Sequence, residues 1–330
     1  MESRPEELAC QPGHASERAI QVLAGREVPL GGPRAMKVRR TLPHRERSFV
    51  GAWCFVDHFG PEDVTESGGM DVAPHPHTGL QTVSWLFAGE VEHRDSAGVH
   101  GMVRPGEVNL MTGGHGICHS EVSTEATSTL HGVQLWLALP DHARAAERDF
   151  IHYTAESFEF SHSEVVRGSA SGRVFIGSLA GHSSPVPTFS PVVGAEITLE
   201  PDTELALRVD PQFEHAVLVD SGEVRFDSTD LKESDLGCRD AGPSTLHISS
   251  TAATPARLIL LGGVPFDEEI IMWWNFVGRS HEEIVRFRDE WEQGSDRFGV
   301  VSGYTGKIDR LPAPPLPGGR LKKRNRRGRV

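Results

Sequence analysis

The sequence has few cysteines, fewer basic than acidic residues outside its C-terminus and no long apolar segment, and each of these features excludes a class of protein. The four cysteines form no C-x-x-C pair, so the sequence predicts neither a disulfide framework nor a thiolate zinc site. The longest apolar runs, 258–264 and 270–277, are far shorter than the roughly 20 residues that a membrane helix needs. The acidic N-terminus does not resemble a signal peptide. We therefore expect a cytoplasmic protein with no membrane partner.

Positive charge is concentrated in the last eleven residues. The formal net charge is −13, although seven residues of 320–330 are Lys or Arg and none is acidic. Nucleic acids and anionic membranes attract basic surfaces, so the acidic body argues against a nucleic-acid partner. A basic run of this kind is typical of a solvated, disordered terminus.

The chain is long enough for two domains, at roughly 150 residues each. Short runs rich in Val, Ile, Leu, Thr, Phe and Trp are interrupted by Gly, Pro, Asp or Asn throughout the body, which favours an all-β fold. The pattern is similar before and after residues 140–165. We predict two β-barrels: 19–145 and 146–310, between a disordered N-terminus (1–18) and a disordered basic tail (311–330).

One short helix is predicted near the C-terminal end of the body, at about 281–293. Ser280 and Glu283 form a capping box, in which each side chain bonds a backbone N–H of the other residue. Ile284, Phe287 and Trp291 then recur at helical spacing. We expect this helix to pack on the outside of a barrel.

Two pairs of residues in the N-terminal half indicate a metal site. They are His75-Pro76-His77 and His119-Ser120-Glu121. Side chains at i and i+2 of a β-strand point to the same face, so each pair can present both side chains to a barrel interior. If the two strands were neighbours, three imidazoles and one carboxylate would converge.

The donor types narrow the choice of metal. Imidazole and carboxylate suit Fe, Mn, Co, Ni, Cu or Zn better than Ca or Mg, which prefer oxygen ligands. An octahedral ion held by His75, His77, His119 and Glu121 would keep up to two positions for substrate or dioxygen. Glu121 is also the nearest candidate for a catalytic base.

Several segments spread over nearly the whole body carry a family resemblance. They are Val56-Asp57-His58-Phe59-Gly60-Pro61, 74–85 around the first histidine pair, 109–121 around the second, His131-Gly132-Val133-Gln134-Leu135-Trp136-Leu137, 39–43, and Asn275-Phe276-Val277 before the predicted helix. Together they resemble the pirin family of the cupin superfamily.

The resemblance implies a bicupin with one metal, typically iron, in the N-terminal barrel. By motif, the ligands fall on His75, His77, His119 and Glu121. Some pirins are quercetin 2,3-dioxygenases, and others are nuclear iron-dependent cofactors of transcription regulators. We therefore expect a monomeric Fe(II) dioxygenase that takes a small flavonol-like aromatic substrate and O2. The alternative is a redox-responsive metal protein that binds a regulatory protein or enzyme without turnover.

Other residues near the motifs are harder to assign. Gln81 stands where many relatives have Glu, and strand alternation from His75 would place it on the metal side. Two roles are open for its side chain: a hydrogen bond to substrate or water, or simple packing within the strand. His115 has an open role, and His58 is interpreted as structural. An isomerase or lyase of small sugars or acids would need an anion pocket, for which Arg94 and Arg104 are too few. The second barrel has no comparable histidine pair, so we expect it to be metal-free.

Overall fold

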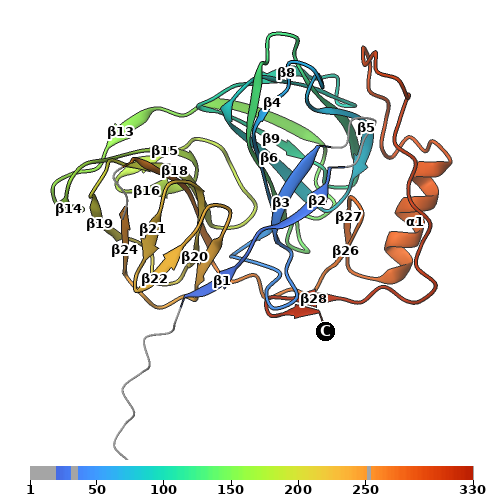
Figure 1. The fold of residues 1–330 in the computed structure, drawn as a ribbon. Helices are drawn as coiled ribbons and strands as arrows, with labels where there is room; N and C mark the ends of the chain where they lie inside the picture. The colour runs from blue at the N-terminus through green and yellow to red at the C-terminus, as the bar shows by residue number, and fades with distance from the viewer. Residues whose placement is uncertain (1–19, 31–35, 251–253, 330) are drawn as a thin grey trace, which may run out of the picture.

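The computed structural model describes residues 20–30, 36–250 and 254–329, and the fold is dominated by β-strands. Two β-barrels lie side by side, and one helix lies against the outside of the first of them (Figure 1). The predicted all-β class with two barrels and a short C-terminal helix is confirmed. The segment 1–18, predicted to be disordered, lies outside the described residues.

Two antiparallel sheets form the first barrel. The larger sheet has the spatial order β12 (Asp149–Thr154), β9 (Glu107–Thr112), β6 (Leu80–Ala88), β11 (Thr129–Ala138), β4 (Trp53–Asp63), β3 (Lys37–Leu42) and β2 (Arg26–Pro29). The smaller sheet has the order β5 (Asp71–His77), β10 (Ile117–Ser123), β7 (Val91–Asp95) and β8 (His100–Val103).

The second barrel repeats this plan with a seven-stranded and a five-stranded sheet. The larger has the order β1 (Gln21–Leu23), β23 (Leu236–Arg239), β20 (Glu214–Ser221), β25 (Ala256–Gly263), β18 (Val192–Leu199), β15 (Ala170–Ile176) and β13 (Ser157–Glu159). The smaller has the order β14 (Val165–Arg167), β19 (Glu204–Arg208), β24 (Thr245–Ser250), β21 (Val224–Phe226) and β22 (Thr229–Leu231).

Three short hairpins and the helix complete the described chain. The hairpins are β16 (Ser178–Leu179) with β17 (His182–Ser183), β26 (Ile271–Trp273) with β27 (Phe276–Gly278), and β28 (Arg324–Asn325) with β29 (Gly328–Arg329).

The helix α1 (His281–Glu292) lies where the sequence predicts it. Ser280 caps it by accepting a hydrogen bond from the backbone N–H of Glu283 at 3.2 Å. Its buried side chains pack with Cys118 of β10, so the helix covers the first barrel although it follows the second in sequence. Within the described residues, no helix combines the length and the apolarity that a membrane crossing requires.

The segments that make up each barrel differ from the predicted domain boundaries. β1 pairs with β23 of the second barrel, whereas β12, placed after the predicted boundary at 145/146, pairs with β9 of the first. The hairpin of β26 and β27 also joins the first barrel, because Val277 N donates to Thr78 O at 3.0 Å. The two ends of the chain therefore cross over between the barrels, an arrangement that a linear reading could not anticipate.

The C-terminal segment packs against the body, in contrast to the expected disordered tail. Ile270 and Arg324 exchange two backbone hydrogen bonds, of 3.0 and 2.7 Å. The Arg326 guanidinium lies 3.2 Å from the carboxylate of Glu214, which is fully buried. Leu311 N donates to Pro74 O at 2.9 Å. The basic residues thus meet a buried acidic group and the backbone of a buried residue, Ile270, partners that are distant in sequence.

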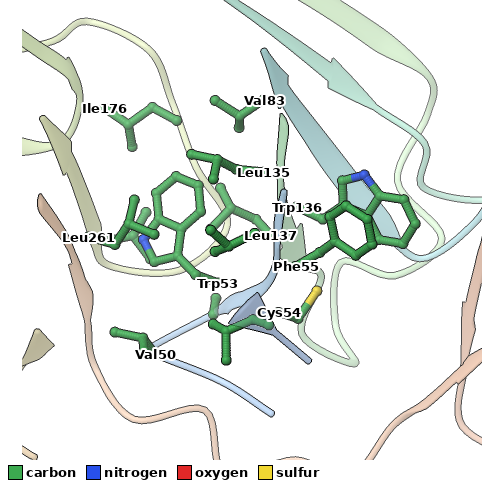
Figure 2. Close-up of a cluster of buried hydrophobic side chains, with 14 of the residues drawn as sticks. Val50, Trp53, Cys54, Phe55, Val83, Leu135, Trp136, Leu137, Ile176 and Leu261 are labelled. Carbon is green, nitrogen blue, oxygen red and sulfur yellow. The ribbon is translucent and has the colours of Figure 1, made fainter. Parts of the chain in front are cut away.

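One hydrophobic core spans both barrels. Trp53 and Leu137 of the first barrel pack in the same cluster as Ile176 and Leu261 of the second (Figure 2). The register of β4 against β11 shifts by one residue at Cys54, so Trp53 points to the second barrel while Phe55 points the other way. The wall formed by β4 and β11 therefore separates this shared core from the interior of the first barrel.

Candidate metal centre

The two predicted histidine pairs lie on neighbouring strands of the smaller sheet. β5 and β10 pair antiparallel, with His119 opposite His75 and Ile117 opposite His77. Because cross-strand neighbours and i, i+2 neighbours share a face, this register directs the three imidazoles to one point. The expectation that these strands are adjacent is confirmed.

The ring nitrogens of His75, His77 and His119 converge. One nitrogen of each lies within 4.8 Å of the others, and none of the three residues is more than 6% exposed. The Nε2 atoms of His77 and His119 are 3.0 Å apart. Two nitrogen ligands about 2.1 Å from one ion, at right angles, would be separated by about 3.0 Å. The donor set therefore fits a bound transition metal.

Burial favours the unprotonated form of the three histidines, which is the form that binds a metal. It lowers the pKa of His75 to about 4 and holds the pKa values of His77 and His119 well below the usual range. The imidazoles are thus neutral, the form that binds a metal. Burial also raises the pKa of Glu121, so an ionised carboxylate there requires a nearby positive charge.

Each of these imidazoles has one ring nitrogen in the cluster and one that points away from it, here called the outer nitrogen. The outer nitrogen of His75 points to a hydrogen-bond acceptor. Its Nδ1 lies 2.9 Å from the carbonyl oxygen of Ala73, which can only accept, so Nδ1 carries the hydrogen and Nε2 keeps its lone pair. The outer nitrogen of His119 faces His93, a buried residue of β7 that the sequence analysis missed. The signal was present, since His93 and Asp95 form a third i, i+2 pair of ligand-type side chains.

Glu121 follows a β-bulge and lies beside the three histidines. The pairing of β10 with β5 shifts between His119 and Glu121, which places Glu121 opposite Val72. Its carboxylate lies 3.3 Å from the hydroxyl of Ser84 and lines the same pocket as the imidazoles. The described group of mutually close donor atoms comprises the three histidines without Glu121.

A pocket of about 380 Å³ opens above the histidines. One wall is aromatic, because Phe55 and Trp136 stack with ring centroids 4.0 Å apart. The Arg40 guanidinium lies 4.3 Å from the centroid of Phe55 and binds both carboxylate oxygens of Asp57 at 2.7 Å. Trp274, from the hairpin after the second barrel, also lines the pocket. The volume and the aromatic lining are typical of a site for a small organic molecule.

A second cluster, His58, His131 and Asp220, lies between the barrels. Both Nε2 atoms approach Asp220 Oδ1, at 2.8 and 2.6 Å. The Nδ1 atoms face donors: His58 Nδ1 lies 3.0 Å from the Ser234 hydroxyl and 3.3 Å from the Arg39 guanidinium, and His131 Nδ1 lies 3.4 Å from the Arg257 guanidinium. A guanidinium only donates, so each Nε2 carries the hydrogen and donates to Asp220. This cluster is built as a hydrogen-bond network and not as a ligand set, consistent with the structural role expected for His58.

The structure places Gln81 and His115 away from the histidine cluster. Gln81 pairs with Leu137, on the face of the sheet opposite to Trp136, and donates to Thr112 Oγ1 at 3.0 Å. The expectation that it faces the metal is wrong, because the turn at 78–79 separates β5 from β6 and ends the alternation. His115 Nδ1 lies 3.3 Å from the carbonyl oxygen of Ala146, in a different cavity.

Comparison with known proteins identifies similar chains over nearly the full length. The pirin family model matches residues 35–137, and the model of the pirin C-terminal cupin domain matches 194–299. "Putative quercetin 2,3-dioxygenase PA1205" of Pseudomonas aeruginosa is 40% identical over 304 residues, which cover 91% of this chain and 92% of that protein. A pirin-like protein of Caulobacter vibrioides is 34% identical over 263 residues, covering 78% and 88%. The crystal structure of a quercetin 2,3-dioxygenase from Acinetobacter baumannii has a TM-score of 0.84 at 35% identity, covering 92% and 97%.

Proposed function

We propose, for a chain that belongs to the pirin family of bicupins, that the first barrel holds a divalent metal and oxidises a flavonol-like aromatic substrate with dioxygen. Fe(II) is the metal that we assign, and Mn, Co, Ni, Cu and Zn fit the same donor types. His75, His77 and His119 would hold the ion, and Glu121 would complete the donor set.

One observation supports this proposal above the others: three neutral, converging imidazoles form the floor of a pocket with an aromatic wall. A planar polyphenol can stack on the Phe55 and Trp136 face while its enolic oxygens approach the histidines. A bound transition metal would supply Lewis acidity for a substrate hydroxyl and a position for dioxygen.

The protein's own groups would handle the proton and the orientation of the substrate. Glu121 is the carboxylate that lines this pocket beside the histidines, and once ionised next to a bound metal it would be the group that accepts a hydroxyl proton. The hydroxyl of Ser84, 3.3 Å away, can hold the orientation of that carboxylate. Arg40 presents a positive charge at the aromatic wall, where it can attract an electron-rich ring or an ionised hydroxyl.

The test is oxygen consumption by purified protein of known iron content after addition of quercetin. We expect uptake of dioxygen together with loss of the flavonol absorbance. His75→Ala removes one imidazole, so it should reduce both the iron content and the oxygen uptake to background. His162→Ala, at an exposed position of the second barrel, is the matched control and should leave both unchanged.

Full iron occupancy without oxygen uptake would exclude quercetin as the substrate. A His75→Ala protein that retained stoichiometric iron and full activity would overturn the assignment of the site.

A further inference from the structure

A chain of two hydrogen bonds leads from His119 to a carboxylate outside the histidine cluster. The Nδ1 atoms of His119 and His93 are 3.3 Å apart, and His93 Nε2 lies 3.1 Å from Asp95 Oδ2. All three residues are buried, with at most 4% exposed. β7 and β10 pair so that Asp95 lies opposite His119 and His93 lies opposite Glu121. Neither His93 nor Asp95 belongs to the group of converging donors.

The contacts of Asp95 fix the direction of these hydrogen bonds. Its Oδ1 accepts from the backbone N–H groups of Ala97, at 2.8 Å, and Val99, at 3.1 Å, in the turn after β7. Its Oδ2 is left to face His93, so His93 Nε2 carries a hydrogen and donates it. In a neutral imidazole the other nitrogen, here Nδ1, is then an acceptor.

The same logic continues to His119. With His93 in the neutral form, its Nδ1 can only accept, so the hydrogen between the two rings belongs to His119 Nδ1, and the Nε2 of His119 keeps its lone pair. That Nε2 is the atom 3.0 Å from His77 Nε2 in the converging cluster. Phe150 stacks on the His93 ring, with centroids 4.6 Å apart, and holds its orientation.

We propose that Asp95 and His93 are positioning residues, which hold His119 in the tautomer that presents Nε2 to the metal. This inference rests on the metal site proposed above and adds two residues to it. Partners of this kind, which orient a ligand without touching the ion, typically change metal affinity by about 10–100-fold when they are removed.

Asp95→Asn tests the direction of the chain with almost no change in shape. The two turn amides require an acceptor, so the oxygen of the new carboxamide would stay on their side and its NH2 group would face His93. His93 would then become a donor at Nδ1, and His119 would carry its hydrogen on Nε2, where a metal must bind. We expect the affinity for Co²⁺, measured by competition with a chelator, to fall by about 10–100-fold.

The ring tautomer gives a readout that is independent of metal and of activity. In metal-free full-length protein, nitrogen-15 NMR of labelled histidine should show His119 protonated at Nδ1. The same ring should be protonated at Nε2 in Asp95→Asn, with the signals assigned by comparison with His119→Gln. Asp63→Asn is the matched control, because Asp63 also accepts from a turn N–H, that of Thr65 at 3.0 Å, but is exposed and lies at the end of β4.

A second variant protects the test against a folding defect in Asp95→Asn. His93→Phe keeps an aromatic ring against Phe150 but removes the acceptor, so Co²⁺ affinity should again fall while the thermal melting of the metal-free protein stays close to that of the wild type. Wild-type affinity in both variants, or an unchanged His119 tautomer in Asp95→Asn, would overturn the inference. Failure of the wild type itself to bind Co²⁺ would instead overturn the metal site on which it rests.

Discussion

Burial keeps several histidines of this protein neutral, and for this reason the folded state loses stability as the pH falls. It lowers the pKa values of His58, His77 and His119, and it lowers those of His75 and His215 to about 4. In the unfolded chain the same groups would titrate near about 6.5. The neutral form suits metal binding at His75, His77 and His119, but each of these five imidazoles binds a proton more weakly in the folded state than in the unfolded chain.

His215, in the second barrel, allows this effect to be measured away from the proposed metal. A folded-state pKa below the unfolded value means that the unfolded chain takes up the proton first, so stability present above about pH 6.5 is lost as the pH falls toward 4. Between pH 7.5 and 5, His215 should contribute about 2 kcal/mol to the loss of unfolding free energy.

His215→Leu should reduce this pH dependence by that amount in urea unfolding followed at both pH values. Val217→Ala, a buried change on the same strand that removes no titratable group, should lower the stability at both pH values equally. An identical pH dependence in wild type and His215→Leu would contradict the prediction.

At the residue scale, alternation along single strands was the dependable part of the sequence analysis. It was sufficient for His75, His77 and His119, because each pair lies within one strand and the two strands are neighbours. It failed for Gln81, where a turn intervenes between strands. His93 and Asp95 carried the same alternating signal, but their importance depends on which strand lies beside β10, and that is a property of the barrel.

Among the elements, the hairpin of β26 and β27 has a special position, because it follows the second barrel in sequence and lines the pocket of the first. Trp274 at its turn has φ +52°, a left-handed conformation that is uncommon for a large side chain, and its indole lines the proposed substrate pocket. Backbone strain of this kind is typical of functional sites. The sequence analysis assigned Asn275 and its neighbours only to a family match and could not place them at the pocket.

Trp274→Gly separates the two roles of this turn. Glycine accepts the left-handed conformation, so the fold should be kept with only a small loss of thermal stability from the missing contact with Phe276, whereas loss of the indole should weaken the binding of quercetin by several-fold in a fluorescence titration. Trp273→Gly is the control, because Trp273 lines a different cavity beside the C-terminal segment. Equal effects of both substitutions on quercetin affinity would argue against a role of Trp274 in the pocket.

The C-terminal segment is a second element whose place could not be predicted from composition. Arg326 approaches the buried Glu214 at 3.2 Å, while burial raises the pKa of that carboxyl and the nearby Arg47 opposes the shift. Arg326→Gln should therefore lower the unfolding free energy by about 1 kcal/mol in chemical denaturation. Arg327→Gln, at an exposed position, should change it by less than about 0.5 kcal/mol. Equal, negligible effects of the two would indicate that the segment does not bind the body.

At the scale of the whole molecule, the two barrels are joined by buried polar groups as well as by a shared core. Trp85 of the first barrel donates to Glu196 of the second at 2.7 Å, and Arg47 lies 2.7 Å from Glu214. Groups this deeply buried would be costly to expose, so separation of the barrels is unfavourable. We expect the molecule to unfold as one cooperative unit although its sequence matches two family models.

A substitution at Asp220 tests two expectations: that the molecule unfolds in one transition, and that the cluster of His58, His131 and Asp220 binds no metal. Burial alone would raise the pKa of Asp220, but the hydrogen bonds from His131 and His58 outweigh it and lower the pKa. Asp220→Asn would turn an NH2 group toward Arg257 or toward the two imidazole N–H groups, and no acceptor would replace the lost oxygen. The unfolding free energy should fall by about 3–5 kcal/mol, still in a single transition.

The metal content of Asp220→Asn should equal that of the wild type, although the variant is less stable. Because the outer nitrogens of His58 and His131 face Arg39 and Arg257, this cluster is built to donate hydrogens and should bind no ion. Elemental analysis of the wild type and of Asp220→Asn should therefore give one metal per chain in both, whereas His77→Ala should give none. Two metals per chain in the wild type, with one lost in Asp220→Asn, would show that the second cluster also binds metal and that its outer nitrogens do not decide its chemistry.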